Sequence, residues 1–290
     1  MRARGMHMWG AIIGDVVGSV YEWDRIKTKT FDLFHSEGHF TDDSVCTAAI
    51  ADILLHDRGA PETLQKWCRR HPASYGGWFV DWMWSDHPEP YGSFGNGAAM
   101  RISPAAFLHY DDLDAALAAS DRLTEITHNH PEGLKGARAT VHATWLALEG
   151  EEAHVIRRTI AARYRYNLVR SVDDIRTFYR FDETCQNTVP EAITCALEST
   201  CFEDAIRNAI SLGGDSDTVA AIAGPIAEGL HGIPEGIQRV VEERFLAKAP
   251  DIVEVMHEMY DEVERRRARQ RKLRRKKATR PRTRFPARSG

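Results

Sequence analysis

Residues 39–55, HFTDDSVCTAAIADILL, place Thr41, Asp42 and Asp43 directly before an apolar run with helical periodicity. Threonine and aspartate in this position are typical of a helix N-terminus, because their side-chain oxygens accept hydrogen bonds from the unpaired N–H groups of the first turn. Acidic residues there also interact favourably with the helix dipole. Helix capping alone would therefore explain this stretch.

A second stretch with the same pattern lies near the other end of the chain. Residues 212–230, LGGDSDTVAAIAGPIAEGL, place Asp215, Asp217 and Thr218 before another helical run, which is rich in small residues. If the two helix starts converge, their carboxylates lie together in low dielectric and stay ionised only around a cation. Carboxylate and hydroxyl oxygens suit the hard ions Mg²⁺ and Mn²⁺ better than zinc. The paired stretches thus predict a metal site at two converging helix starts.

The composition is that of a soluble globular protein, because 43% of the 290 residues are hydrophobic and 28% are charged. The apolar runs are shorter than the roughly 20 residues that span a bilayer. The N-terminus resembles a secretory signal, with Arg2 and Arg4 before an apolar stretch, but Asp15 interrupts that stretch. We therefore expect a buried helix there and not a targeting segment, and no membrane-spanning segment in the chain.

Cysteine usage points to the same kind of protein. The five cysteines are scattered through the chain and form no C-x-x-C pair. This pattern argues against a disulfide framework and against a thiolate zinc site. We expect reduced thiols and a cytoplasmic location.

Helical periodicity dominates the chain, whereas alternating strand patterns are scarce. We expect an all-α fold, with a single compact multi-helix domain over residues 6–263. A basic tail, residues 264–290, should continue the last helix and become disordered near Thr279. The expected helices cover residues 8–20, 44–57, 61–70, 112–127, 134–149, 151–163, 188–198, 202–212, 218–231 and 234–264. On the first of them Gly10, Gly14 and Gly18 share a face on which a neighbouring helix can approach closely.

Three further stretches each have an ordinary explanation and a functional one. Residues 91–107, YGSFGNGAAMRISPAAF, form a glycine-rich turn, which is either a connecting loop or a place where backbone N–H groups contact an anion. Residues 126–133, ITHNHPEG, put His128 and His130 at a helix end, where the dipole favours histidine; their spacing does not suit a zinc pair. Residues 78–84, WFVDWMW, are an aromatic stripe, typical of a core and less often of a base-stacking wall.

The chain resembles the ADP-ribosylglycohydrolases in a series of motifs that occur in the family's order: GAIIGDVVGSVYE, FTDDSV, SFGNGAAMRISP, THNHPEGLKGA, TVPEAI and GGDSDTVAAIAGPIAEGLHG. The resemblance runs from Gly10 to Gly232. Ser44 is a departure, since many members have threonine there. The resemblance implies an all-α fold with two Mg²⁺ ions, or Mn²⁺, at its centre.

The resemblance also implies roles for individual residues. Glu22 is expected to cover the metals as a flap residue, and proton transfer falls to Glu22 or to a carboxylate among Asp42, Asp43 and Asp217. The sequence does not choose between them. The implied metal ligands are Thr41, Asp42, Asp43, Asp215, Asp217 and Thr218. The implied contacts to ADP-ribose are Ser93, Phe94, Gly95, Asn96, Gly97 and His128.

The implied function is metal-dependent hydrolysis of the glycosidic bond between ADP-ribose and a modified acceptor, which is a protein side chain, a nucleic acid or a small molecule. This cleavage passes through an oxocarbenium-like state and needs an oriented ribose and an activated water. Two alternatives stay open. A catalytically silent relative would bind ADP-ribose or serve a structural role, although the complete ligand set argues against it. A metal-dependent phosphohydrolase would release AMP instead of intact ADP-ribose.

Charge is distributed unevenly along the chain, although the net charge is only −4. Residues 265–290 contain 14 Lys and Arg and no acid, so the rest of the chain carries 24 basic and 42 acidic residues, a net charge of −18. The tail is either a solvated charge run, a segment that folds back on the acidic body, or a contact for nucleic acid. The family resemblance does not extend to it. We expect the protein to be a monomer.

Overall fold

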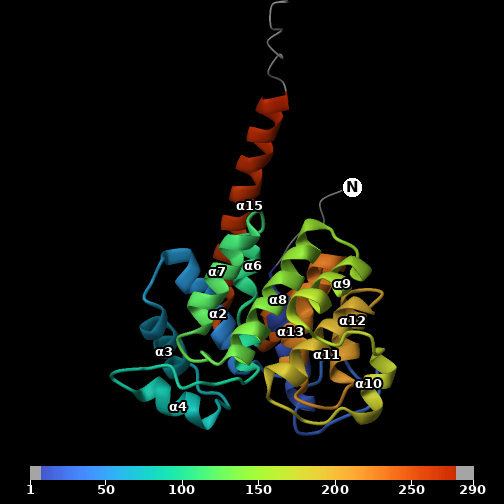
Figure 1. Ribbon diagram of the computed structural model, residues 1–290. Coiled ribbons are helices and arrows are strands. Elements are labelled where there is room, and N and C mark those ends of the chain that lie inside the picture. Colours follow the sequence, from blue (N-terminus) through green and yellow to red (C-terminus); the bar gives the residue numbers. More distant parts are fainter. Residues whose placement is uncertain (1–7, 279–290) are drawn as a thin grey trace, which may run out of the picture.

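Helix α1 (Gly10–Gly18) lies along helix α13 (Ser216–His231) in the middle of the molecule (Figure 1). The computed structural model describes residues 8–278, with side chains described as far as Lys272. Every residue of α1 is buried, and so is α13 from Ser216 to Glu228. Such complete burial needs a helix that is apolar or small on all sides, as both sequences are except at Asp15, Asp217 and Glu228. Because α13 also packs against α8, α11 and α12, it is the axis of the fold.

Three glycines set the distance between α1 and α13. A Cβ atom at Gly14 would lie 2.2 Å from a carbonyl oxygen of α13, and Cβ atoms at Gly10 and Gly18 would meet the α13 backbone at 2.5 Å. These spacings leave no room for a side chain, which confirms the predicted close approach. The contacts run from Gly10 against Gly224 to Gly18 against Asp217, so the two helices are antiparallel.

The antiparallel pairing also fixes both ends of α1. The carboxylate of Glu228, near the end of α13, accepts hydrogen bonds from the N–H groups of Met8 at 2.5 Å and Gly10 at 3.0 Å. At the opposite end, the hydroxyl of Ser216 donates to the carbonyl of Tyr21 at 3.1 Å. The segment that follows α1 is thereby held at the start of α13.

The other helices gather on two sides of α1, α8 and α13 (Figure 1). One side holds α2–α4, α6 and α7, and the other holds α9–α12. The bounds are 3₁₀ helix Ser19–Tyr21, α2 Asp42–His56, α3 Ala60–Arg70, α4 Gly77–Trp84, α5 Gly97–Met100, α6 Ser103–Leu108, α7 Leu113–Thr124, α8 Pro131–Glu149, α9 Ala153–Tyr164, α10 Val172–Phe178, α11 Cys185–Leu197, α12 Phe202–Ile210, α14 Glu235–Val240, π-helix Val241–Phe245 and α15 Pro250–Ala278.

The all-α prediction is confirmed for residues 8–278, where the chain forms no strand and only an isolated bridge joins Gly95 and Thr184. The prediction of one helix over residues 234–264 was wrong. α14 passes into the π-helix, the chain leaves helical structure, and α15 begins at Pro250. Proline has no N–H and excludes the preceding residue, Ala249, from helical geometry, so α15 starts afresh there.

Four short helices, α4, α5, α6 and α10, lie outside the expected helix ranges. α4 lies in the aromatic stripe and α10 begins at a capping box formed by Ser171 and Asp174. The stripe itself divides, because Trp82 is buried in the core whereas Trp78 is 67% exposed.

Helix α15 projects beyond the rest of the molecule (Figure 1). Its first half packs against α2 and α6, and it continues through residue 264 without a break. Arg267 stacks over the ring of Tyr110, with its Cζ 4.9 Å from the ring centroid. The predicted disorder beyond Thr279 lies outside the described residues. Within residues 8–278 no helix combines the length and the apolar character that a membrane span requires.

Candidate metal centre

The start of α2 is capped by two side chains from different parts of the chain. The hydroxyl of Thr41 accepts a hydrogen bond from the N–H of Asp43 at 3.3 Å. The carboxylate of Asp15, on α1, accepts from the N–H groups of Thr41 at 2.9 Å and Ser44 at 3.0 Å. It also accepts from both hydroxyls, that of Thr41 at 2.7 Å and that of Ser44. Thr41 therefore caps α2, whereas the side chain of Asp43 is not needed for capping.

The start of α13 is built differently. Gly213 adopts a φ of +63°, which side-chain-bearing residues rarely tolerate, and a Cβ atom there would lie 2.7 Å from the carbonyl oxygen of Ile26. This turn delivers Asp215 to the N-cap position, yet its side chain accepts no bond from the helix. Instead, the amide of Asn96 donates to Asp215 Oδ2 at 2.6 Å. Asp215 is thus oriented from outside its own helix.

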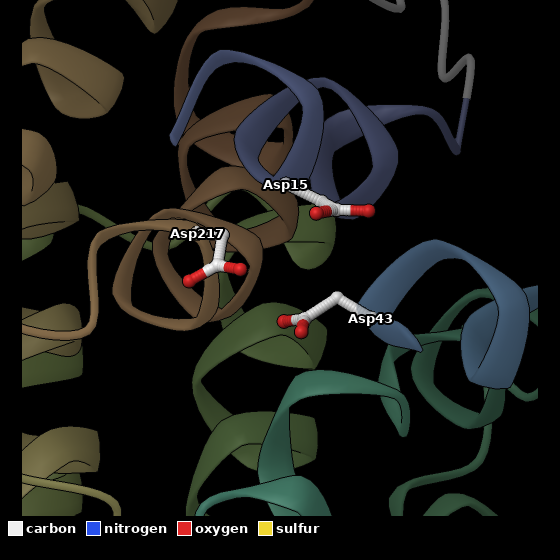
Figure 2. Close-up of side chains that lie close together, drawn as sticks. All are labelled: Asp15, Asp43 and Asp217. Carbon is white, nitrogen blue, oxygen red and sulfur yellow. The ribbon is translucent and has the colours of Figure 1, made fainter. Parts of the chain in front are cut away.

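The two helix starts and α1 bring carboxylates together. Figure 2 shows Asp15, Asp43 and Asp217 turned toward one another from α1, α2 and α13. Each offers an oxygen within 4.8 Å of the others, and Glu22, Asp215 and Asp217 form a second such group. Asp217 belongs to both groups, so the two are adjacent.

The clustering raises the affinity of these carboxylates for protons. Burial, followed by repulsion from Asp217, raises the pKa of Asp15 and that of the half-buried Glu22 to about 7. The same two causes hold the pKa of Asp43 and of Asp215 well above the usual range. Burial also raises the pKa of Asp217. A cation between the groups would remove the repulsion that these shifts express.

The residues present fit a hard divalent cation. Asp43 Oδ1 is buried and has no hydrogen-bond partner among the described residues. An unpaired buried carboxylate oxygen is costly unless something binds it. Every donor in both groups is a carboxylate oxygen, the type that Mg²⁺ and Mn²⁺ prefer.

A cavity of about 480 Å³ opens onto both carboxylate groups. Thr41 and Phe94 do not line it: Thr41 is buried beneath it and Phe94 faces His130, with ring centroids 5.2 Å apart. Asp42 lines the cavity but belongs to neither carboxylate group. The other predicted site residues that line it are Glu22, Asp43, Ser93, Gly95, Asn96, Gly97, His128, Asp215, Asp217 and Thr218.

The stretch around His128 does not end a helix, contrary to the expectation. α7 ends at Thr124, and His130 Nδ1 accepts a hydrogen bond from the N–H of Glu132 at the start of α8. His128 is buried beside the glycine-rich turn, where the amide N–H groups of Gly95 and Asn96 are hydrogen-bonded within the protein. The two histidines therefore serve different elements, and they do not form a zinc pair.

Sequence reasoning missed two residues of the site. Asp15 was read only as an interruption of an apolar stretch, and Arg101 was passed over within the glycine-rich stretch. The signal for Asp15 was present, because an acid on a helix that is otherwise apolar and small must be buried. Arg101 is 1% exposed and lines the cavity.

Comparisons with known proteins agree with the fold. A sequence profile described as ADP-ribosylglycohydrolase matches residues 1–272. ADP-ribosylarginine hydrolase Tri1 from Pseudomonas putida is 26% identical over 286 residues, covering 85% of this chain and 76% of the relative. Human ADP-ribosylhydrolase ARH3 is 25% identical over 317 residues, which cover 80% of this chain and 87% of the human protein. The ADP-ribosyl-[dinitrogen reductase] glycohydrolase of Rhodospirillum rubrum is 26% identical over 267 residues, which cover 81% of this chain and 87% of that relative.

The fold has a solved counterpart. A structure titled ADP-ribosylglycohydrolase-related protein complex superposes with a TM-score of 0.64, covering 90% of this chain and 100% of that one. At 21% sequence identity, this likeness concerns the fold alone.

Proposed function

Because the chain belongs to the ADP-ribosylglycohydrolase family, we propose that it hydrolyses the glycosidic bond between ADP-ribose and a modified acceptor with the help of two Mg²⁺ ions, which Mn²⁺ can replace. The single observation that supports this best is the pair of carboxylate groups that share Asp217 at the edge of one cavity. Two adjacent groups of oxygen donors suit two ions better than one.

Bound ions would chelate the ribose hydroxyls and lower the pKa of a water molecule, which supplies the nucleophile. The ligands we assign from the family resemblance are Thr41, Asp42, Asp43, Asp215, Asp217 and Thr218. To these the geometry adds Asp15, which stands in the same carboxylate group as Asp43. Asn96 orients Asp215 through its amide, and Thr218 donates to Asp43 Oδ2 at 3.3 Å.

Glu22 is the residue we assign to proton transfer. It follows the 3₁₀ helix, is half-buried, and lies within reach of Asp215 and Asp217 at the cavity. In the metal-free protein burial, followed by repulsion from Asp217, raises its pKa to about 7, and a carboxylate with a raised pKa can both accept and donate a proton. The family resemblance assigns Asp42, Asp43 and Asp217 as metal ligands but not Glu22. Because a carboxylate that binds a cation is a weaker base, this assignment favours Glu22 in the role.

The acceptor is tested directly with a panel of ADP-ribose linkages. The names of two relatives specify arginine and dinitrogen reductase, so ADP-ribosylarginine is the first substrate, followed by serine, nucleic-acid base, guanidine and O-acetyl linkages. We expect Mg²⁺- or Mn²⁺-dependent release of intact ADP-ribose from at least one of them. Release of AMP would replace this proposal with a phosphohydrolase, and binding without any turnover would indicate a silent relative.

We further propose that the basic end of the chain holds this enzyme near nucleic acid, while the catalytic unit is monomeric and cytoplasmic. Residues 265–290 contain 11 arginines and 3 lysines. Arginine binds phosphate in a bidentate manner, whereas the single aromatic residue there, Phe285, offers no stacking platform. Binding should therefore depend on salt and be indifferent to base sequence.

A further inference from the structure

Arg101 is a buried cation at the wall of the cavity. The residue is 1% exposed, and its Cζ lies 5.9 Å from the centroid of the Phe79 ring. Among the described residues no carboxylate forms an ion pair with it. Its Nη2 atom donates to the hydroxyl of Thr127 at 2.6 Å, while its Nε has no hydrogen-bond partner among the described residues. A buried guanidinium without a carboxylate is destabilising unless something else compensates its charge. Apart from the ring of Phe79, this charge has no partner that balances it, so the structure places a cation without an anionic partner beside the predicted ADP-ribose site.

The hydroxyl of Thr127 is hydrogen-bonded to both Arg101 and His128. A guanidinium has only donors, so Thr127 accepts from Arg101 and keeps its own hydrogen for another atom. Thr127 Oγ1 lies 2.7 Å from His128 Nδ1, which is the only acceptor in contact with this hydroxyl among the described residues. Thr127 is fully buried, so no bulk water takes the hydrogen instead. The hydrogen-bond chain thus makes His128 Nδ1 an acceptor and puts the ring proton on Nε2.

His128 Nε2 faces the glycine-rich turn. A Cβ atom at Gly97 would lie 3.2 Å from Nε2, and one at Gly95 would lie 3.6 Å away. The glycines leave this nitrogen free of a covering side chain at the cavity that both Gly95 and Gly97 line. Burial, followed by the positive charge of Arg101, holds the pKa of His128 well below its usual range, so the ring is neutral. Asn129 fixes the segment by accepting from the N–H of Gly92 at 2.8 Å.

We propose that Arg101 and Thr127 are positioning residues, which hold His128 as a neutral, Nε2-protonated imidazole that donates a hydrogen bond to the diphosphate of the substrate. This proposal rests on the proposed function for its ligand, while the hydrogen-bond chain itself is a property of the free protein. The positive charge of Arg101 adds attraction for the same anion without contacting it. His128 thereby contributes to substrate binding, and the carboxylate groups carry out the chemistry.

The test compares Thr127→Val, which keeps the shape and removes the hydroxyl, with Thr127→Ser, which keeps the hydroxyl. Nitrogen-15 NMR of the histidine side chains reports the tautomer in the free protein, with His128→Gln to assign the signal. In the wild type and in Thr127→Ser we expect the Nε2-protonated form. In Thr127→Val we expect a mixture of tautomers, about tenfold weaker binding of ADP-ribose and a similar rise in KM, with kcat changed less than about threefold.

Arg101→Met provides a second route if Thr127→Val does not fold. Methionine has a similar length, and replacing a buried charged group by an apolar one of similar volume is often tolerated. This variant should also lose the tautomer preference, although Thr127 is still present. An unchanged Nε2-protonated signal in both variants overturns the positioning proposal even if the enzyme is active.

Failure of the proposed function has a different signature. If the wild type binds no ADP-ribose and releases none, the diphosphate part of the inference and the proposed function fall together, whatever the NMR shows. If the wild type binds ADP-ribose and the variants bind it equally well, only the inference falls. A purely structural role for Thr127 would lower the thermal unfolding temperature but leave the tautomer and the KM unchanged, which also contradicts the proposal.

Discussion

At the start of α2, Thr41 and the carboxylate of Asp15 accept the N–H groups of the first turn, whereas at the start of α13 the N-cap residue Asp215 accepts none from its own helix. The start of α2 is capped partly by Asp15 of α1. At the start of α13, Asn96 of the glycine-rich turn orients the side chain of Asp215. Capping therefore accounts for Thr41 and leaves Asp43 and Asp215 unexplained, while Asp217 Oδ1 accepts the N–H of Thr218 at 3.0 Å and has its other oxygen to spare. Both helix starts thus hold more carboxylate oxygens than capping needs, which is what we expect where acids bind cations.

The largest effect is expected from the acids of the two carboxylate groups. Asp217→Asn and Asp43→Asn should each lower turnover at least about 10³-fold, about 4 kcal/mol of barrier, because each leaves the cations short of a charged ligand. The control is Asp174→Asn in the exposed capping box of α10, which has the same charge change at a helix start far from the cavity. Turnover of Asp174→Asn should stay at the wild-type level, with at most about 1 kcal/mol lost in stability.

Circular dichroism and thermal unfolding establish that all three variants are folded. Full activity of Asp43→Asn or Asp217→Asn, or of the wild type after exhaustive chelation, would show that these acids only cap their helices.

The next effect concerns Glu22, the member of the second carboxylate group that does not belong to either helix start. Glu22→Gln keeps the shape and removes the charge that accepts a proton. Turnover should fall about 10²- to 10⁴-fold, as for the loss of a general acid or base, while ADP-ribose binding changes less than about threefold. Steady-state kinetics and calorimetric titration separate the two quantities. Equal losses in both would make Glu22 a binding residue.

A smaller effect concerns the stability of the metal-free protein. The pKa of Asp15 is about 7 in the folded chain against 3.8 for an ordinary aspartate. Between these values the folded state holds a proton that the unfolded chain releases, so the free energy of unfolding falls as the pH rises, by up to about 1.4 kcal/mol per pH unit. Thermal unfolding in a chelator, from about pH 4 to pH 7, measures this fall.

Mg²⁺ should raise the unfolding temperature more at the upper end of that range, because it binds the ionised carboxylates. Asp217→Asn is the matched variant, since it removes the charge that repels Asp15. Its metal-free stability should fall less steeply with pH. Identical pH dependence in the wild type and the variant would mean that the carboxylates do not repel one another.

The smallest effect on turnover is expected at the end of α15, remote from both helix starts. Truncation after residue 264 removes no site residue, so hydrolysis of a small substrate should be unchanged. Binding to duplex DNA or RNA should be lost. If the intact tail contacts about five phosphates, log K should fall with log salt at a slope of about −4.5. Equal and negligible binding by both proteins at low salt would leave the tail as a solvated charge run.

The sequence predicted the two helix starts because each combines capping residues with more acids than capping needs. It also predicted that Gly10, Gly14 and Gly18 share a contact face, since this follows from helical periodicity alone. Asp15 could not be placed by such local reasoning. Its role depends on which helix lies opposite α1 and in which direction, and only the antiparallel packing on α13 brings it to Thr41 and Asp217.

Arg101, Thr127 and His128 show the same limit within the site. The motifs that contain them are separated in sequence, and their hydrogen bonds form only when α5 and the segment after α7 meet at the cavity. The misplaced boundary at residues 234–264 has another cause. There the helical periodicity was extended through Pro250, although proline marks a new start.

The pairing of α1 with α13 has a consequence for biosynthesis. The chain leaves the ribosome from its N-terminus onward, so α1 emerges long before its partner has been translated. Glu228, which closes the start of α1, comes 218 residues after Gly10. Until then the glycine face of α1 is uncovered, and Asp15 and Asp43 have no Asp217 beside them. The carboxylate groups therefore cannot assemble until nearly all of the chain has been synthesised, and the first helix is without its partner during that time.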